Sequence, residues 1–380
     1  MDKLLLIPGP SPVHPRILDA LAAPTIAHTS PEMAADMTAA LDGLRTIVSS
    51  AAGEPFIIAG AGTLSMEVAI LNVSGPGDRV LILSQGYFGD RMEQICASFG
   101  IAHDVLRAPW GSAVPAEALA SRLREGRYDI VSVTHVDTST GACAPVEDYG
   151  RVLKDSGILY IVDGVCATGG IDERMDEWGI DIVLTAAQKA FGAPPGLAIC
   201  VFSERAVAKR LGLPSVPAYY SDILRWRPIM KDPKKYFSTH GVNEIRAFAE
   251  AVRMMLEEGM PARFARHRRT ALAFRAALAA LGFSLFTEPA YLGDTISVPL
   301  YPAGIDDGAF RAALGRNGVV VAGGLAETAG KLFRLGHMGN LSTGQILSAV
   351  DAVEKSLAEL SYPFAAGSAS AAARAELERG

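Results

Sequence analysis

The sequence predicts an α/β protein: a large domain with a mostly parallel sheet flanked by helices, and a smaller C-terminal α+β domain. First, 380 residues are enough for two packed domains, and 49% hydrophobic residues are enough for a large core. Second, apolar β-rich runs alternate with helical patterns between residues 55 and 205. Third, these runs are continuously apolar, which is typical of a parallel sheet covered by helices on both faces.

The large domain is predicted from six strand-like runs and the helical patterns around them. The expected strands are residues 55–59, 80–84, 129–135, 158–163, 181–185 and 197–202. The expected helices are residues 64–73, 90–99, 115–124, 145–154 and 243–258. Ligands of parallel sheets bind at the carboxyl ends of the strands, so the polar residues that follow these runs are the candidates for function.

The smaller domain is predicted from a second pattern that begins near residue 260. Its helices are expected at residues 264–281, 307–316 and 343–360, and its strands at residues 295–300, 319–322 and 332–335. The predicted division is an N-terminal segment 1–15, a large domain 16–259, a small domain 260–364 and a tail 365–380. We expect the Ala-, Gly- and Ser-rich tail to pack weakly, with a helical turn or two at residues 372–379.

The composition argues against several classes of function. The net charge of −6 argues against a nucleic-acid partner, and the basic stretch 263–269 is expected to be a solvated helix face. The four cysteines are widely spaced, which argues against a disulfide framework or a zinc site, and no metal is expected. Neither a signal sequence nor a membrane-spanning run is found, so we expect a cytoplasmic protein that does not bind membranes.

Lys189 is the first candidate for chemistry. It follows the apolar run 181–185, and a Gly/Pro-rich turn and a second apolar run follow it. A lysine in this place is either a surface-loop residue or a nucleophile at the mouth of the sheet. Lysine forms Schiff bases with carbonyl cofactors, and a partly desolvated amine is easier to deprotonate.

Asp163 is the second candidate, because it ends the apolar run 158–163, where a carboxylate is costly to bury without a cationic partner. It either caps the following turn or holds the pyridine nitrogen of pyridoxal phosphate (PLP) protonated, so that the ring withdraws electrons from the substrate Cα. Asp163 and Lys189 end two runs and lie 26 positions apart, and as a pair they are more specific than either residue alone.

Residues 60–63, Gly-Ala-Gly-Thr, follow the first run and open a helix. Glycines let the backbone approach a phosphate, and a helix N-terminus supplies free N–H groups and a positive dipole. Small residues also suit a tightly packed strand–helix turn, so the motif alone is weak. It is not the dinucleotide fingerprint, because Ser65 stands in place of the third glycine.

Three further positions carry candidate ligand-binding side chains. Phe88 follows the second run and either covers the core or stacks on a flat ring. Thr138 belongs to the polar cluster 135–140, which is either an ordinary turn or a set of hydrogen-bonding groups for a cofactor ring. Arg334 lies within an apolar run, where it forms a structural ion pair or binds a carboxylate in bidentate fashion.

With these residues the chain resembles the class V aminotransferases of PLP fold type I, in particular the alanine–glyoxylate and serine–pyruvate (serine–glyoxylate) aminotransferases. The resemblance covers nearly the whole chain. Its most specific motifs are residues 134–141, 162–165, 188–189, 194–196 and 333–336.

The resemblance implies a role for each candidate residue. Lys189 carries pyridoxal 5′-phosphate as a Schiff base and moves the proton between the substrate Cα and the cofactor, while Asp163 binds the pyridinium nitrogen. The remaining cofactor-binding residues are Gly62, Thr63 and Gln188 at the phosphate, Phe88 on the ring, and Thr138. Arg334 binds the substrate carboxylate, and Gly9 is also assigned to substrate binding.

The resemblance also implies a homodimer, because Tyr236 and Thr239 match positions that reach the phosphate of the partner subunit's cofactor. The chain departs from the family pattern at Thr63, where relatives often have His, and at Phe88, where Trp is commoner. Residues 239–243 lack a Thr-Pro pattern that many members show. These departures lie near the cofactor or substrate, so they leave the preferred amino acid open.

The implied reaction is a ping-pong transfer of the amino group of a small L-amino acid, alanine or serine, to glyoxylate or pyruvate. Small amino acids and keto acids are therefore the expected partners. Alternatives within class V are aminotransferases for ureidoglycine or aminoethylphosphonate, lyases and desulfurases. A nucleotide-binding α/β protein without PLP is a further alternative, which the broken glycine fingerprint disfavours.

Overall fold

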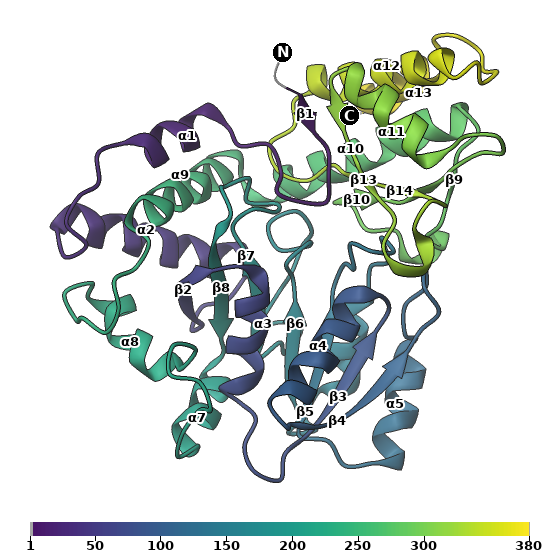
Figure 1. The fold of residues 1–380 in the computed structure, drawn as a ribbon. Helices are drawn as coiled ribbons and strands as arrows, with labels where there is room; N and C mark the ends of the chain where they lie inside the picture. Colours follow the sequence, from purple (N-terminus) through teal and green to yellow (C-terminus); the bar gives the residue numbers. More distant parts are fainter. Residues whose placement is uncertain (1–2, 380) are drawn as a thin grey trace.

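The computed structural model describes residues 3–379 and confirms the predicted architecture, a mostly parallel sheet flanked by helices (Figure 1). Its strands are β2 (Glu54–Gly60), β3 (Arg79–Ser84), β4 (Ala102–Arg107), β5 (Ile130–Thr134), β6 (Leu159–Asp163), β7 (Ile182–Ala186) and β8 (Gly196–Phe202). They lie in the order β2-β8-β7-β6-β5-β3-β4, and β8 alone runs in the direction opposite to the other six strands. Residues 1, 2 and 380, which belong to the predicted N-terminal segment and tail, lie outside the described residues.

All six expected runs form strands of this sheet, and β4 is the strand that the apolar pattern does not predict. β4 lies at the edge of the sheet, and its residues are half-buried or exposed. β2 lies at the opposite edge but is largely buried, so it keeps an apolar run; the incomplete burial of β4 is why its sequence lacks the continuous apolar run on which the prediction depends.

Helices cover both faces of the sheet. Those of the large domain are α1 (Pro15–Ala22), α2 (Pro31–Ile47), α3 (Gly62–Leu71), α4 (Tyr87–Ser98), α5 (Ala116–Glu125), α6 (Val146–Leu153), α7 (Glu204–Gly212), α8 (Ile223–Lys231) and α9 (Val242–Glu258). The consecutive residues Ile57 and Ile58 are both buried but belong to different cores, the first containing side chains of α2 and α9 and the second side chains of α3. The consecutive residues Val183 and Leu184 are likewise buried in different cores, Val183 in the first and Leu184 in the second. Two buried faces therefore explain why the strand runs are continuously apolar.

The small C-terminal domain is the green-to-yellow part of Figure 1. Its elements are α10 (Met260–Ala280), β9 (Ser284–Leu285), β10 (Ile296–Ser297), β11 (Pro299–Leu300), α11 (Asp307–Arg316), β12 (Val319–Val320), β13 (Ala322–Gly323), β14 (Phe333–Gly336), α12 (Thr343–Glu359) and α13 (Ser368–Glu378). The expected strand 295–300 is two strands, because β10 pairs with β14 whereas β11 pairs with β9. β1 (Leu4–Leu5) pairs with β12, so the N-terminal segment joins this domain. We propose the domain boundary at Gly259, which joins α9 to α10 with φ of +81°.

The prediction of a weakly packed tail is wrong. Most of the tail forms α13, which lies against α10 and α12, and Ala369 and Ala373 are fully buried in the core of the small domain. These residues are four positions apart and therefore share one helix face, and their small side chains allow close approach of the helices. The Glu354 carboxylate of α12 accepts hydrogen bonds from the backbone N–H groups of Gly367 and Ala369 at the start of α13.

The basic stretch 263–269 is only partly the solvated helix face that composition predicts. Arg268 is exposed, but Arg263 and His267, one helical turn apart, are 1% and 0% exposed. α10 passes between the two domains, so charged residues on its inner face are enclosed by tertiary contacts that the local sequence does not reveal.

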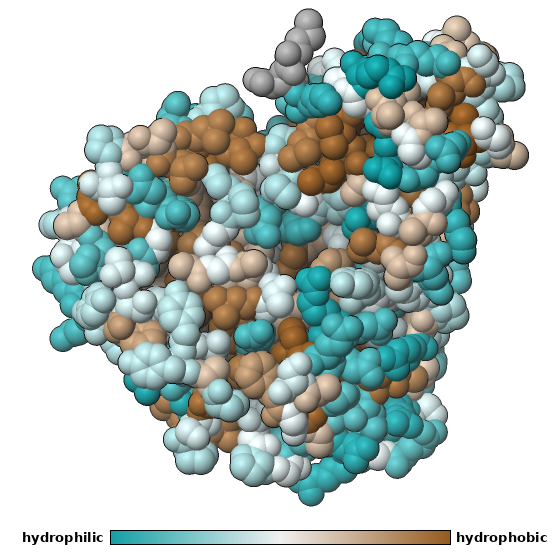
Figure 2. Space-filling view, viewed as in Figure 1, coloured by the Kyte–Doolittle hydropathy of each residue, from teal (hydrophilic) through white to brown (hydrophobic). Residues whose placement is uncertain are grey.

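The surface is uneven in polarity. Figure 2 shows apolar side chains grouped over α1 and β1 in the upper part of this face, whereas the lower right part, over α4 and α5, is hydrophilic. None of the helices within residues 3–379 is both long enough and apolar enough to cross a membrane.

Candidate active site

A cavity of about 230 Å³ lies at the carboxyl ends of the parallel strands. Seven of the residues singled out in the sequence line it: Gly62, Thr63, Phe88, Thr138, Asp163, Gln188 and Lys189. They come from the segments that follow β2, β3, β5, β6 and β7, which are separated in the sequence but adjoin in space because their strands share one sheet. The expectation that polar residues after the strands gather at one place is therefore confirmed.

Lys189 lies half-buried in the wall of this cavity, so the alternative of a surface-loop lysine is wrong. Its Nζ donates to the carbonyl of Pro8, and its own carbonyl accepts from Ser11 Oγ at 2.7 Å. Burial lowers the pKa of the Lys189 amine, with the charge of Arg334 acting in the same direction. A lowered pKa increases the fraction of free amine, which is the nucleophilic and proton-accepting form.

Gly9 lies against Lys189 from the N-terminal segment. Its φ is +114°, a conformation that favours glycine, and a Cβ at this position would lie 2.5 Å from Lys189 Cδ. Gly9 therefore leaves the space in which the lysine side chain lies, although it does not itself line the cavity.

Asp163 ends β6 and is 2% exposed. Its Oδ1 accepts from the backbone N–H of Val165 at 3.0 Å, so the turn-capping bond is present, while Oδ2 accepts only a 3.5 Å bond from Thr134 Oγ1. Burial raises the pKa of Asp163 to about 7, and the nearby carboxylates of Asp137 and Glu173 add to this effect. The charge of Lys189 acts in the opposite direction, but within residues 3–379 no cationic side chain forms a hydrogen bond or ion pair with Asp163, so a protonated ring nitrogen would supply a direct partner.

The N-terminus of α3 forms the end of the cavity where a phosphate is expected. α3 begins at Gly62, and the residue before it, Ala61, provides no side-chain cap. The first N–H groups of a helix have no intrahelical partner, so those of this turn are available to an anion. Gln188 also lines the cavity, and the group that it offers to a phosphate is its side-chain NH2, which donates, whereas its Oε1 can only accept. Gly62 serves close packing as well, since a Cβ there would lie 3.3 Å from side-chain atoms of Ala186 and Val165.

Phe88 is fixed by a residue whose importance the sequence does not reveal. The carboxylate of Asp137, which is fully buried, accepts from the backbone N–H of Phe88 at 2.9 Å and from that of Ser139 at 2.8 Å. Arg91 also lines the cavity, with its guanidinium 4.6 Å from the centre of the Phe88 ring and 3.3 Å from Thr63 Oγ1. Its position one helical turn after Phe88 on α4 is the signal that could have identified it.

Arg334 lies on β14, beside the cavity. Its Nε donates to the Gly323 carbonyl at 2.8 Å and its Nη1 to the Thr138 carbonyl at 3.3 Å. It makes no ion pair within residues 3–379, so the alternative of a structural salt bridge is not supported there. Tyr236 and Thr239 lie outside this cavity, in the segment between α8 and α9; both are exposed, Tyr236 by 68%.

Taken together, the residues present fit PLP. The first turn of α3 and Gln188 provide donors and a polar partner for the phosphate, Phe88 provides a flat apolar face, and Asp163 provides a buried carboxylate. Lys189 provides an amine with a lowered pKa within the same cavity. These are the four kinds of group that bind the parts of this cofactor.

Comparison with known proteins leads to the same cofactor. The family model for class V aminotransferases matches residues 8–341. The chain is 34% identical to an L-aspartate–glyoxylate aminotransferase of Paracoccus denitrificans, over 97% of this chain and 95% of that protein. It is 35% identical to alanine–glyoxylate aminotransferase 1 of Saccharomyces cerevisiae, over 88% of this chain and 91% of that protein. The crystal structure of the ureidoglycine–glyoxylate aminotransferase of Bacillus subtilis is similar with a TM-score of 0.95 and 28% identity, over 99% of this chain and 98% of that one.

These similarities extend over almost the whole chain, so they include every strand end that contributes to the cavity. The fold is that of PLP-dependent enzymes of fold type I. The chain therefore belongs to the class V aminotransferase family and is a PLP-dependent transaminase.

Proposed function

We propose that this transaminase moves the amino group of a small L-amino acid, alanine or serine, to glyoxylate or pyruvate in two half-reactions. The observation that carries the proposal is the convergence of Lys189 and Asp163 on one cavity, with Arg334 beside it. Glyoxylate is the best supported acceptor, because all three proteins compared above are named for it although their amino donors differ.

In the proposed mechanism, Lys189 Nζ first holds the cofactor and then acts as the base. Bound PLP withdraws electrons from the substrate Cα through its protonated ring. Lys189 Nζ takes the proton from Cα and delivers it to the cofactor's C4′, for which the free amine must be present; its lowered pKa favours this form. Asp163 holds the proton on the ring nitrogen, because its buried carboxylate gains a cationic partner there.

The other residues bind and orient the two ligands. We assign the phosphate to the N–H groups of Gly62 and Thr63 and to the side chain of Gln188, the ring face to Phe88, and a polar ring substituent to Thr138. The Arg334 guanidinium binds the α-carboxylate of the substrate, since two carbonyls orient it and no carboxylate in residues 3–379 forms an ion pair with it. Gly9 contributes to substrate binding by leaving space beside Lys189.

A homodimer with shared sites completes the proposal. Tyr236 and Thr239 are exposed and do not line the cavity of their own chain. This is expected of side chains that reach the phosphate in the partner subunit. Other large apolar side chains are exposed as well, among them Leu18 on α1, by 46%, and Tyr219, by 67%. Burial of such side chains is the usual source of dimer stability.

Two alternatives within the family differ in their support. A desulfurase needs an accessible thiolate, but Cys166, the cysteine that lines the cavity, is 2% exposed, and burial raises the pKa of its thiol to about 11. Ureidoglycine remains a competing donor because of the similarity to the Bacillus subtilis enzyme. Aminoethylphosphonate and the lyase reactions have no such observation in their favour.

The test is the visible absorbance of the purified PLP-loaded protein during addition of one amine at a time. L-Alanine, L-serine, L-aspartate, ureidoglycine and aminoethylphosphonate are the amines to compare, with glyoxylate and pyruvate as acceptors. We expect alanine or serine to abolish the band of the lysine-linked cofactor and glyoxylate to restore it. Response to another amine alone would contradict the proposed donor, and absence of the band after PLP addition would contradict the whole proposal.

A further inference from the structure

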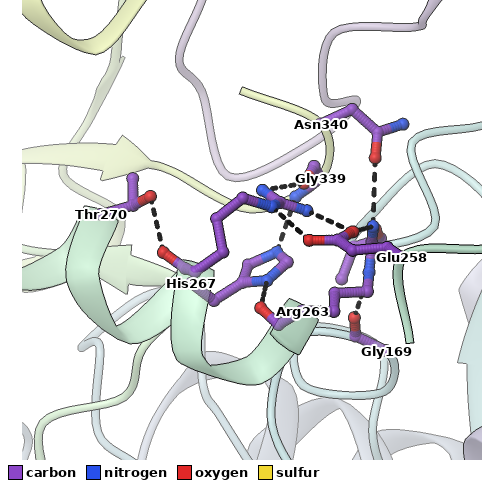
Figure 3. Close-up of polar contacts among 9 residues, drawn as sticks. Gly169, Glu258, Arg263, His267, Thr270, Gly339 and Asn340 are labelled. Carbon is purple, nitrogen blue, oxygen red and sulfur yellow. Dashed lines mark hydrogen bonds and ion pairs between the residues drawn. The ribbon is translucent and has the colours of Figure 1, made fainter. Parts of the chain in front are cut away.

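Arg263 is a charged side chain enclosed between the two domains. It lies in the first turn of α10 and is 1% exposed. Figure 3 shows it surrounded by Gly169, Glu258 and Asn340. Its Nε donates to the Gly169 carbonyl at 2.8 Å, and its Nη1 contacts Glu258 Oε2 at 2.9 Å and Asn340 Oδ1 at 3.1 Å. Its Nη2 donates to the carbonyl of Ala190.

Three of these acceptors belong to segments that follow residues of the proposed mechanism. Gly169, Ala190 and Asn340 lie six, one and six positions after Asp163, Lys189 and Arg334, respectively. One guanidinium therefore connects the loop after the ring-nitrogen ligand, the turn that carries the reactive lysine, and the loop after the carboxylate ligand. Its fork of five N–H donors in one plane suits such a three-way connection, whereas a lysine ammonium has three donors on a single nitrogen.

Neighbouring contacts limit the movement of the same junction. The His267 ring, one turn after Arg263, bonds to the Arg263 carbonyl through Nδ1 at 2.8 Å and accepts from the Gly339 N–H through Nε2 at 3.1 Å (Figure 3). Arg266 Nη1 donates to the Gly339 carbonyl at 3.0 Å. A Cβ at Gly339 would lie 3.8 Å from the Lys189 carbonyl oxygen, so this segment adjoins the lysine turn directly.

Burial of Arg263 is costly, and a purely structural role is a weak account of it. Burial lowers its pKa to about 10, and Arg266 acts in the same direction, while Glu258 opposes both effects. Glu258 is also shared with Arg266, which binds it at 2.6 and 3.0 Å. Replacing a buried ion pair with apolar side chains of similar volume is often neutral or stabilising, so the buried guanidinium is better explained by a role in geometry than by a gain in stability.

We propose that Arg263 is a positioning residue for transamination: it fixes the Lys189 turn relative to the segments that follow Asp163 and Arg334. Arg263 does not line the cavity and, within residues 3–379, forms no hydrogen bond with a side chain that does; it acts through the backbone of Ala190 and Gly169. This inference rests on the proposed roles of Lys189, Asp163 and Arg334.

The test compares Arg263→Lys with Arg268→Lys in the PLP-loaded protein. Arg268→Lys is the matched control, because Arg268 lies on the exposed face of the same helix and pairs with Asp294 at 3.8 Å. Displacement of a reacting group by about 1 Å costs about 10²-fold in rate, so we expect kcat of Arg263→Lys to fall by about 10²-fold with KM changed far less. Arg268→Lys is expected to keep kcat within about threefold of the parent protein, because an exposed substitution away from the junction displaces no reacting group.

Two readouts besides activity accompany these measurements. The first is the pH at which the absorbance of the lysine-linked cofactor changes, which is expected to move by about one unit in Arg263→Lys and to stay constant in the control. The second is hydrogen exchange at the amide of Gly192, which donates to the Lys189 carbonyl at 2.9 Å. Loosening of the turn should accelerate this exchange about tenfold.

The outcomes separate the inference from the proposed function. The inference would be overturned if Arg263→Lys matched the parent protein in kcat, in the pH of the absorbance change and in hydrogen exchange. Equal losses of kcat in Arg263→Lys and in the control would also overturn it. If Arg263→Lys does not fold, Asn340→Ala is the second variant, because it removes one of the four contacts of Arg263. It is expected to accelerate hydrogen exchange at the Gly192 amide, and unchanged exchange would refute the inference. If the parent protein neither forms the lysine-linked band nor turns over any amine, the proposed function fails, whereas the exchange measurement still decides whether Arg263 fixes the turn.

Discussion

Replacement of Asp163 by Asn is expected to stabilise the cofactor-free protein while it disables the enzyme. Burial, together with the carboxylates of Asp137 and Glu173, raises the pKa of Asp163 to about 7 in the folded chain from an ordinary value of 3.8, although the charge of Lys189 acts in the opposite direction. The folded-state pKa is raised, so the stability contributed by the protonated carboxyl is fully present below about pH 4 and is lost as the pH rises through about 7.

The size of the effect follows from the difference between the two pKa values. A shift of one unit corresponds to about 1.4 kcal/mol, so the raised pKa of Asp163 lowers the free energy of unfolding by about 2 kcal/mol at pH 5, where only the unfolded-state carboxyl is ionised, and by about 4 kcal/mol at pH 8. Asn is nearly isosteric and keeps an oxygen for the Val165 N–H. Any cost of its amide group is independent of pH, so the stability of Asp163→Asn relative to the parent should rise by about 2 kcal/mol between these pH values.

The assay is equilibrium urea unfolding of the cofactor-free parent and variant at pH 5 and pH 8. Asp19→Asn on α1 is the control, since its side chain is exposed and a surface substitution changes stability by about 0.5 kcal/mol or less at either pH. With PLP bound, the variant should lose about 10²- to 10³-fold in kcat, in the range of a lost electrostatic contact at a reacting centre. A pH-independent stability difference would refute the reasoning that Asp163 is a buried carboxyl without a partner.

Three further changes test other parts of the structure. Lys189→Ala should abolish turnover while the protein still binds PLP non-covalently, and turnover at the parent rate would exclude Lys189 as the proton-transferring group. Gly9→Ala should cost about 1–3 kcal/mol of stability in unfolding experiments and lower kcat/KM, because φ is +114° and the methyl group would overlap Lys189. Parent-like stability and kcat/KM would show that a glycine is not required there. Ala373→Leu should destabilise the protein by about 1–3 kcal/mol at unchanged kcat, since the residue is fully buried between helices. Unchanged stability would favour the original prediction that the tail packs weakly.

The sequence was most informative where a residue type conflicts with its local surroundings. Asp163 and Lys189 are polar residues at the ends of apolar runs, and a parallel sheet brings such positions together whatever their separation along the chain. The burial of an individual side chain is the property that sequence patterns predict least well. Arg263 belongs to a basic stretch that looks solvated, and Ala373 to a tail that looks poorly packed, yet both are enclosed by segments distant in sequence.

By itself, the sequence determined the fold class, six of the seven strands of the large sheet, and the set of residues that gather at their carboxyl ends. The physical reason is that hydrophobic periodicity and strand-end chemistry are local properties, which a chain keeps in any context. Only the tertiary structure decided that Asp137 fixes Phe88, that Arg91 lines the cavity, and that one guanidinium, Arg263, connects three loops of the site. These features depend on hydrogen bonds between distant segments, whose geometry is set by packing of the domains.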